Sequence, residues 1–419
     1  MKRILSSVCK AAICKAAIVL GMLPAVAHAA PVKVGFFTPV SGPLAGIGAM
    51  YKPTIDYVLN AYNAGGGWHG EPVKVDIYDD AGTTQGAADR FKQAIADGVR
   101  IIVAAGTSPL AAQNLADIRR WNERNPSDPA IMLIVGAEGS NFIGQDCYFY
   151  SFHFTTTPFI RQNALAKAMK EHGALGAKVF SLQPDYTMGR EMEQATVEGA
   201  KTFGYDVAGT IRHDVFKIRD FSPFIEKIRA AAPETIFTAS SQSDLLLILQ
   251  AAASTGLKAK FAGMFLDEPG NIASAGKAAI GNFGAQIFNT EAGGEAGEKY
   301  RAGFAKIAGR DPVAFANNGV MTLKVLTAAL NILPKADKPA IPALAKALEE
   351  VKTDWPIGEL SIRKEDHQLL LPLVISQVSE DAAYKVDGTS MGFKPVKVLS
   401  VADVATPVSA ACKMERPAN

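Results

Sequence analysis

The sequence has almost no net charge, because 43 Lys and Arg residues against 41 Asp and Glu residues give a formal charge of +2. Nucleic-acid binding requires clustered positive charge, so this balance excludes DNA and RNA as partners. The composition is not that of a disordered chain either, since 48% of the 419 residues are hydrophobic and 20% are charged. A chain of this length is expected to form about two or three domains.

Motifs of catalysis and cofactor binding are incomplete or missing. Gly46-Ile47-Gly48 begins a dinucleotide-binding pattern, but Tyr51 stands where the third glycine is needed. Ser108 lies in Gly-Thr-Ser-Pro-Leu, which lacks the second glycine of a nucleophile elbow. The histidines stand singly, and neither HExxH nor CxxC spacing occurs, so no metal site is indicated. We therefore expect no enzyme, no cofactor and no metal.

The apolar run at the amino terminus is too short to span a membrane. Four basic residues between positions 2 and 15 precede an apolar run over 16–23, well below the ~20 residues of a spanning helix. Ala27-His28-Ala29 follows as a cleavage pattern, so residues 1–29 are predicted to be a signal peptide cleaved after Ala29. With no cysteine at the cleavage site for lipid attachment, the mature chain is expected to be free in the periplasm, with a charge of about −2.

Cysteine is scarce, with four residues in all. Cys9 and Cys14 leave with the signal peptide, and Cys147 and Cys412 remain. Two thiols in an oxidising compartment favour one disulfide, which would tie the carboxyl-terminal tail to the middle of the chain. Two distant free thiols are the alternative.

Strand-like and helix-like segments alternate from Val32 onward, which is typical of α/β folds whose parallel sheets are flanked by helices. Two successive series precede residue 280, so two α/β lobes are expected. The strands expected in the first series cover 32–40, 73–78, 100–104 and 131–135, and those in the second cover 178–182, 206–211, 235–239 and 261–265.

Small and hydroxylic residues follow several of these strands, including Gly106-Thr107-Ser108, residues 136–139 and Ser240-Ser241. Ligands of open α/β sheets bind at the carboxyl ends of the strands. Exposed backbone N–H groups at helix amino termini there suit a carboxylate or another anion. Any one such loop can be a simple turn or cap, but the set predicts a binding cleft.

Several motifs in order resemble the leucine/isoleucine/valine-binding protein family, the type I periplasmic binding proteins of ABC importers. They are Val34–Gly48 (VGFFTPVSGPLAGIG), Asn-Ala-Gly-Gly-Gly at 63–67, Tyr78-Asp79-Asp80, Asp185-Tyr186-Thr187-Met188-Gly189 and Thr255-Gly256-Leu257-Lys258. The resemblance runs from about Val32 to about Leu360. It implies a two-lobed "Venus flytrap" with three interlobe crossings, one lobe formed by 31–150 plus 285–357 and the other by 151–284 plus 358–419.

The resemblance also implies a function. The chain would be a monomeric periplasmic solute-binding component that closes on a small carboxylate ligand and delivers it to an ABC permease and its ATPase in the inner membrane. A receptor that presents its closed form to a membrane sensor is the alternative.

The family's ligand contacts carry over to this chain in part. In the first lobe they fall on Ser108 or its neighbours Thr107 and Leu110, and on residues 137–139 (Ala137, Glu138 and Gly139), where hydroxyl and backbone N–H groups would hold a ligand carboxylate. In the second lobe an aromatic contact falls on Tyr186.

The second lobe departs from the family elsewhere. Phe265 occupies the place of the acid that pairs with a ligand ammonium, with Asp267 two residues on. Phe159 replaces a further aspartate, and Ser241 replaces a second tyrosine. Because a buried ammonium without an acidic partner is costly, an aromatic or aliphatic acid lacking the ammonium is one hypothesis. The other is an amino acid whose ammonium meets Asp267 or Glu138.

Overall fold

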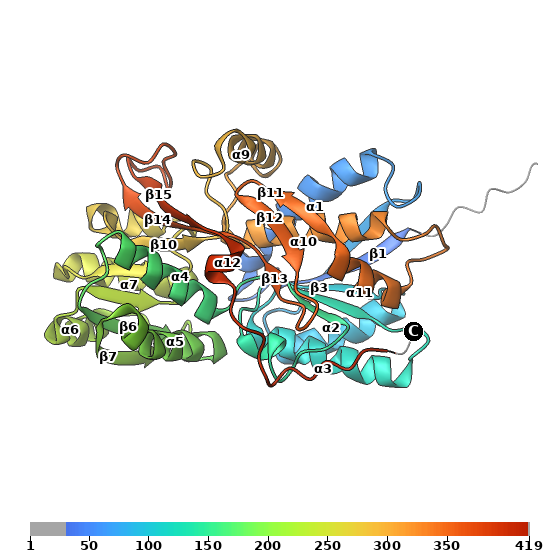
Figure 1. Cartoon of the computed structure of the whole chain (residues 1–419), viewed down its shortest axis with the longest axis horizontal. Coiled ribbons are helices and arrows are strands. Elements are labelled where there is room, and N and C mark those ends of the chain that lie inside the picture. The colour runs from blue at the N-terminus through green and yellow to red at the C-terminus, as the bar shows by residue number, and fades with distance from the viewer. Residues whose placement is uncertain (1–30, 418–419) are drawn as a thin grey trace, which may run out of the picture.

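A computed structural model describes residues 31–417, so the expected signal peptide, 1–29, lies outside the described residues. Within 31–417, no helix combines the length and the apolar character that a membrane crossing demands. The described elements form two α/β lobes that lie side by side, with the second lobe at the left of Figure 1 and the first at the right.

The first lobe is built on a parallel sheet in the order β2-β1-β3-β4-β5. β3 and β4 are apolar throughout and fully buried, as expected for central strands covered on both faces. Helices α1 (Ala45–Ala64) and α10 (Ala314–Asn331) cover one face, and α2 (Thr84–Ala96) and α3 (Ser108–Arg124) cover the other. The strands are β1 (Val32–Phe37), β2 (Val73–Tyr78), β3 (Ile101–Ala104), β4 (Ile131–Ile134) and β5 (Ser151–His153).

The second lobe is built on a sheet in the order β15-β14-β10-β9-β8-β6-β7. The strands from β7 to β10 in this order are parallel, as predicted, whereas β14 and β15 are added antiparallel at the edge beside β10. Helices α4 (Pro158–Glu171), α5 (Thr187–Phe203), α6 (Ser222–Ala231) and α7 (Gln242–Thr255) flank this sheet (Figure 1). The strands are β6 (Lys178–Pro184), β7 (Asp206–His213), β8 (Thr235–Thr238), β9 (Lys260–Gly263), β10 (Phe283–Gln286), β14 (Leu373–Ser379) and β15 (Gly392–Leu399).

The strand pairing moves the expected lobe boundaries. β5 pairs with β4 in the first sheet, although residue 151 was assigned to the second lobe. β10 pairs with β9 in the second sheet, so the chain goes back to the first lobe after residue 286 and not at residue 285. A small sheet of β11 (Lys352–Trp355), β12 (Gly358–Ile362) and β13 (Leu369–Leu370) packs on α10 and α11 (Ile341–Glu350) of the first lobe. The three crossings therefore lie between β5 and α4, between β10 and α9 (Gly294–Ala308), and between β13 and β14.

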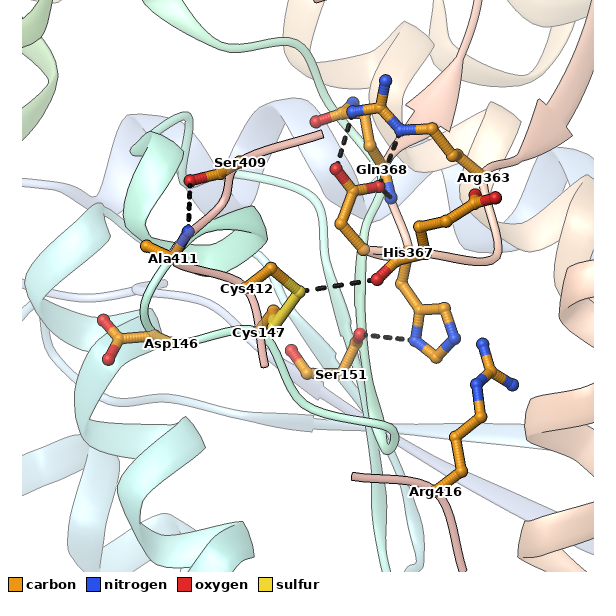
Figure 2. Close-up of a disulfide and its surroundings, with 12 residues drawn as sticks. Asp146, Cys147, Ser151, Arg363, His367, Gln368, Ser409, Ala411, Cys412 and Arg416 are labelled. Carbon is orange, nitrogen blue, oxygen red and sulfur yellow. Dashed lines mark hydrogen bonds and ion pairs between the residues drawn. A yellow bond between two sulfur atoms is a disulfide. The ribbon is translucent and has the colours of Figure 1, made fainter. Parts of the chain in front are cut away.

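The carboxyl-terminal tail makes a fourth crossing. After β15, the short helix α12 (Val401–Val404) packs on α4 of the second lobe, where Lys167 Nζ lies 2.6 Å from Asp403 Oδ1. The chain then runs back to the first lobe, where Cys412 forms the predicted disulfide with Cys147 (Figure 2). Beyond it, Arg416 lies 2.8 Å from Glu349 of α11. The tail thus fastens the two lobes to each other at the crossing side.

Candidate functional site

A cavity of about 220 Å³ lies between the two lobes. Residues from the ends of strands and the starts of helices line it, which is where ligands bind in open α/β folds. Its wall is largely apolar, with a small number of hydroxyl, amide and carboxylate groups. The lining residues are Leu44, Ile47, Gly106, Thr107, Ser108, Pro109, Gly136, Glu138, Tyr186, Met188, Val215, Phe216, Ser241, Gln242, Phe265 and Phe315.

The first lobe contributes the amino terminus of α3. Ser108 is the first residue of this helix and only 5% exposed, and Pro109 follows it. Thr107 occupies the N-cap position but makes no side-chain cap hydrogen bond. Among the described residues, no group forms a hydrogen bond with the Ser108 hydroxyl. Pro109 has no N–H, and the Leu110 and Ala111 N–H groups donate to the Thr107 carbonyl oxygen, so the Ser108 backbone N–H and hydroxyl are the donors at this helix start that suit an anion.

The start of α1 supplies an apolar wall through Leu44 and Ile47. Helix α1 begins at Ala45, so the Gly46-Ile47-Gly48 segment is its first turn. A Cβ atom at Gly48 would lie 2.4 Å from the Pro39 carbonyl oxygen, so only glycine permits this close approach of the helix to the loop after β1. Gly48 therefore serves packing beside the cavity.

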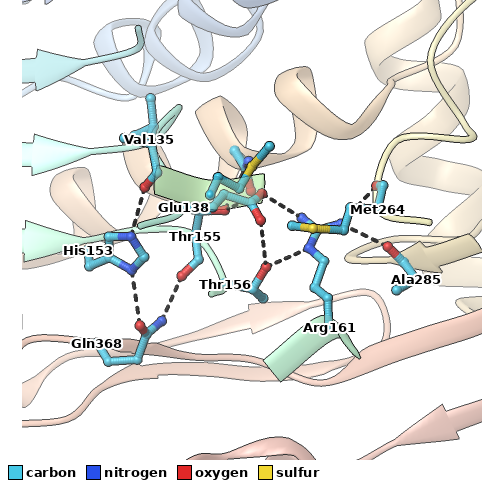
Figure 3. A network of polar contacts seen from close by, with 12 residues as sticks. Val135, Glu138, His153, Thr155, Thr156, Arg161, Met264, Ala285 and Gln368 are labelled. Carbon is cyan, nitrogen blue, oxygen red and sulfur yellow. Dashed lines mark hydrogen bonds and ion pairs between the residues drawn. The ribbon is translucent and has the colours of Figure 1, made fainter. Parts of the chain in front are cut away.

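Glu138 is the carboxylate that the first lobe presents at the cavity, and it is only 2% exposed. Its Oε1 accepts hydrogen bonds from Arg161 Nη2 at 3.0 Å and from Thr155 Oγ1 at 3.1 Å. Thr156 Oγ1 lies farther from Oε2, at 3.4 Å (Figure 3). Burial raises the pKa of Glu138, while Arg161 and the two threonines act in the opposite direction.

The second lobe presents Tyr186 and Met188 at the start of α5 and Ser241 and Gln242 at the start of α7. The Tyr186 hydroxyl lies 3.7 Å from the Met188 sulfur, and burial raises the pKa of Tyr186 well above its ordinary value. Gln242 and Phe216 have φ values of 52° and 58°, a left-handed conformation that is uncommon for residues other than glycine. Two such residues on one cavity wall are typical of a functional site, where surrounding contacts maintain the strain.

A second buried carboxylate holds the Gln242 conformation in place. Glu268 Oε2 accepts from the Gln242 backbone N–H at 2.7 Å, and Glu268 Oε1 accepts from Gln242 Nε2 at 3.0 Å. Burial raises the pKa of Glu268 to about 8. Glu268 is therefore engaged with the helix start, and it does not line the cavity.

The lobes are in direct contact at the cavity and elsewhere. Phe265 of the second lobe stacks on Phe315 of the first, with ring centroids 5.7 Å apart and planes inclined by 4°. The Ser140 backbone N–H of the first lobe donates to Glu191 Oε2 of α5 at 2.8 Å. The structure therefore shows the closed arrangement of the two lobes.

The structure brings most of the predicted site residues together. Thr107, Ser108, Glu138, Tyr186, Ser241 and Phe265 line one cavity, and Ala137 and Gly139 lie in the same loop as Glu138. Phe159 and Asp267 do not line it. Phe159 is half-buried in the first turn of α4, and Asp267 lines a separate cavity beside Gln286. Of the two acids considered for a ligand ammonium, only Glu138 reaches the cavity.

Other wall residues were not predicted. Leu44 and Ile47 directly follow Ser41-Gly42-Pro43, a strand end that the sequence does mark. Phe216 and Phe315 carry no such signal, since Phe315 comes from α10, which follows the second crossing. Arg161, on which Glu138 depends, was also missed, because nothing in its sequence neighbourhood distinguishes it from a surface arginine.

Within residues 31–417, no group of three or more His, Cys, Asp or Glu side chains is placed to hold a metal ion. The two lobes with a largely apolar cavity between them, bounded by helix starts and a carboxylate, define a binding protein for a small solute.

The periplasmic binding protein family model matches residues 31–383, and the chain belongs to this family. It is similar to the Leu/Ile/Val-binding protein homolog 4 of Brucella abortus, with 40% identity over 93% of this chain and 94% of that protein. A closed Brucella ovis structure, described as a leucine-, isoleucine-, valine-, threonine- and alanine-binding protein, shares 39% identity with a TM-score of 0.88. The match covers 92% of this chain and 100% of the Brucella ovis chain.

More distant structures share the fold. A Rhodopseudomonas palustris solute-binding protein in complex with 3,4-dihydroxybenzoic acid has 21% identity and a TM-score of 0.74, covering 90% of this chain and 99% of that one. The chain is thus a solute-binding protein of the branched-chain amino acid type of ABC transporter, acts in the periplasm and is not an enzyme.

Proposed function

We propose that this protein captures a small aliphatic α-amino acid, such as leucine or valine, by closing its lobes on it, and delivers it to an ABC permease and ATPase. The observation that supports this ligand class is the position of Glu138. It lines the cavity, so an acid is available to pair with a ligand ammonium, although Phe265 and Phe159 stand where the family has acids.

The two ends of the proposed ligand have different partners. The carboxylate would accept hydrogen bonds from the hydroxyl and backbone N–H of Ser108 at the start of α3, and from backbone N–H groups of residues 137–139. The ammonium would lie against Glu138, whose Oε2 has only a long contact with Thr156. A buried ammonium is tolerated only with such an acidic partner.

The apolar side chain of the ligand would contact residues that border the same cavity from both lobes. Phe265 and Phe315 form a stacked pair at one side, and Ile47 and Met188 add aliphatic surface. Tyr186 and Ser241 complete the second-lobe wall. The most similar of the relatives described above, at 39–40% identity, carry names that include leucine, isoleucine and valine, which agrees with this ligand class.

The proposal extends to the export and partners of the chain. We propose that the signal peptide is cleaved near Ala29 and that the mature protein is a monomer, free in the periplasm. The importing permease would recognise the closed arrangement of the lobes.

A thermal-shift screen of the mature protein tests the ligand class. Because a ligand that binds only the folded state stabilises it by about 2.7 kcal/mol at 100 times its dissociation constant, leucine or valine is expected to raise the melting temperature. Isocaproate, which is leucine without its ammonium group, and benzoate are expected to have little effect at the same concentration. A shift with benzoate and none with any aliphatic amino acid would contradict the proposal.

Ser108→Ala is expected to weaken amino acid binding by about 1–3 kcal/mol, because the ligand carboxylate loses a buried donor. Isothermal titration calorimetry with leucine measures the change. Ser254→Ala makes the same chemical change at the far end of α7 and should leave the affinity as it is. Unchanged affinity in Ser108→Ala would remove this residue from the site.

A further inference from the structure

Arg161 is entirely buried between the lobes and connects them. It belongs to α4 of the second lobe, and its Nη1 donates to the carbonyl oxygens of Met264, at 3.1 Å, and Ala285, at 2.8 Å. Its Nη2 reaches across to Glu138 of the first lobe at 3.0 Å, and its Nε donates to Thr156 Oγ1 at 2.6 Å in the first crossing (Figure 3). The ion pair therefore spans the two lobes.

The local sequence fixes this side chain in an unfavourable place for a cation. Thr157 caps α4 by accepting from the Ile160 N–H, and Pro158 is the first helical residue, so Arg161 lies in the first turn. The helix dipole disfavours positive charge there, and complete burial removes the guanidinium from water. The carbonyl oxygens of Met264, directly after β9, and of Ala285 in β10 compensate for both costs together with the Glu138 carboxylate. Arg161 therefore has more hydrogen-bond partners than an exposed ion pair requires.

The pair also governs the charge at the cavity. Burial alone would favour the neutral form of Glu138, and a neutral acid does not pair with an ammonium ion. Arg161 and Thr155 both bind Oε1, so Oε2 remains the less engaged oxygen of a residue that lines the cavity. The buried Tyr51 and Tyr186 hydroxyls also interact electrostatically with Glu138, and Asp267 interacts with Arg161. None of these three groups supplies positive charge.

We infer that Arg161 is a positioning residue for the ligand ammonium: it keeps Glu138 charged and oriented at the cavity, and it does so only when the lobes are arranged as here. Recognition of the ammonium is thereby tied to lobe closure, because the carboxylate is carried by one lobe and its guanidinium partner by the other. This inference rests on the proposed amino acid ligand. A purely structural ion pair would instead affect every ligand alike.

The test compares leucine with isocaproate by calorimetry in wild type, Glu138→Gln, Arg161→Met and the double variant. Wild type is expected to prefer leucine. In each variant the dissociation constant for leucine should rise roughly 10- to 100-fold, as for the loss of a charge-assisted hydrogen bond, while that for isocaproate stays within about threefold. The double variant should lose no more than either single variant, because the two residues act as one unit. Arg212→Met, which breaks an exposed pair with Glu193, is the control and should retain the wild-type preference.

The outcomes separate the inference from the proposed function. If Arg161→Met weakens leucine and isocaproate equally, Arg161 is structural and the inference is wrong, although the amino acid ligand stands. If wild type binds isocaproate as tightly as leucine, the ammonium is not recognised and both are wrong. Should Arg161→Met not fold, the double variant is compared with Glu138→Gln: a further loss of leucine affinity of more than about threefold, matched by the same loss for isocaproate, would show that Arg161 acts apart from Glu138 and would overturn the inference.

Discussion

Replacing Cys147 and Cys412 together by serine is expected to lower the free energy of unfolding by about 4–5 kcal/mol. The disulfide joins residues 265 apart in sequence, so it constrains a long loop of the unfolded chain. It also secures the tail to the first lobe, where the other contacts are ion pairs and hydrogen bonds such as that between Arg416 and Glu349. Urea unfolding of the mature protein, followed by circular dichroism, measures the difference.

Two controls sharpen this prediction. Reduction of the wild type should reproduce the loss, and Cys147→Ser alone should match the double variant, since either removes the same bond. A loss below about 1 kcal/mol would mean that the unfolded chain is not constrained by the bond, and that the fourth crossing owes its place to its other contacts.

Arg161→Met is expected to destabilise the folded protein by about 3–5 kcal/mol, because it leaves the Glu138 carboxylate buried without its cation. It also removes the donors of the Met264 and Ala285 carbonyl oxygens. Combining it with Glu138→Gln should recover a large part of that loss, since the double variant has no buried charge at this place. Urea unfolding at neutral pH measures the free energy of unfolding of wild type, Arg161→Met and the double variant.

The matched exposed control for this stability prediction is Arg229→Met, which breaks a pair with Glu226 on the surface of α6. Such pairs contribute about 0–1 kcal/mol, so little change is expected. If Arg161→Met were as mild as this control, the buried pair would not hold the lobes together. If the double variant were no more stable than Arg161→Met, the unpaired charge would not be the cause of the loss.

The sequence predicts the fold well where local pattern decides it. Buried runs such as 101–104 and 131–134 cannot be anything but central strands once helices alternate with them. The lobe boundaries are harder to predict, because β5 and β10 are the last strands before a crossing, and only their hydrogen-bonding partners show which lobe they join. The tail was the least predictable, since α12 packs on one lobe and Cys412 on the other.

The residues of the candidate site likewise divide into those that local sequence motifs mark and those that only the folded structure reveals. Ser108 and Tyr186 stand at strand-to-helix turns that the motifs mark, and both line the cavity. Phe159 was inferred from the family resemblance and Asp267 from its distance of two residues from Phe265, and neither argument fixes which way a side chain points; Asp267 lines a separate cavity. Arg161 acts through tertiary hydrogen bonds to carbonyl oxygens far along the chain, which leave no trace in its own neighbourhood.

The most direct test of the central claim is a calorimetric titration of the mature, oxidised, ligand-free protein with leucine, followed by benzoate on a fresh sample. The account predicts one leucine site per chain and no measurable benzoate binding, because the cavity places Glu138 where a ligand ammonium requires an acid. Tight benzoate binding with no heat from leucine, isoleucine or valine would contradict it, and would show that the Glu138–Arg161 pair serves only the structure of the closed lobes.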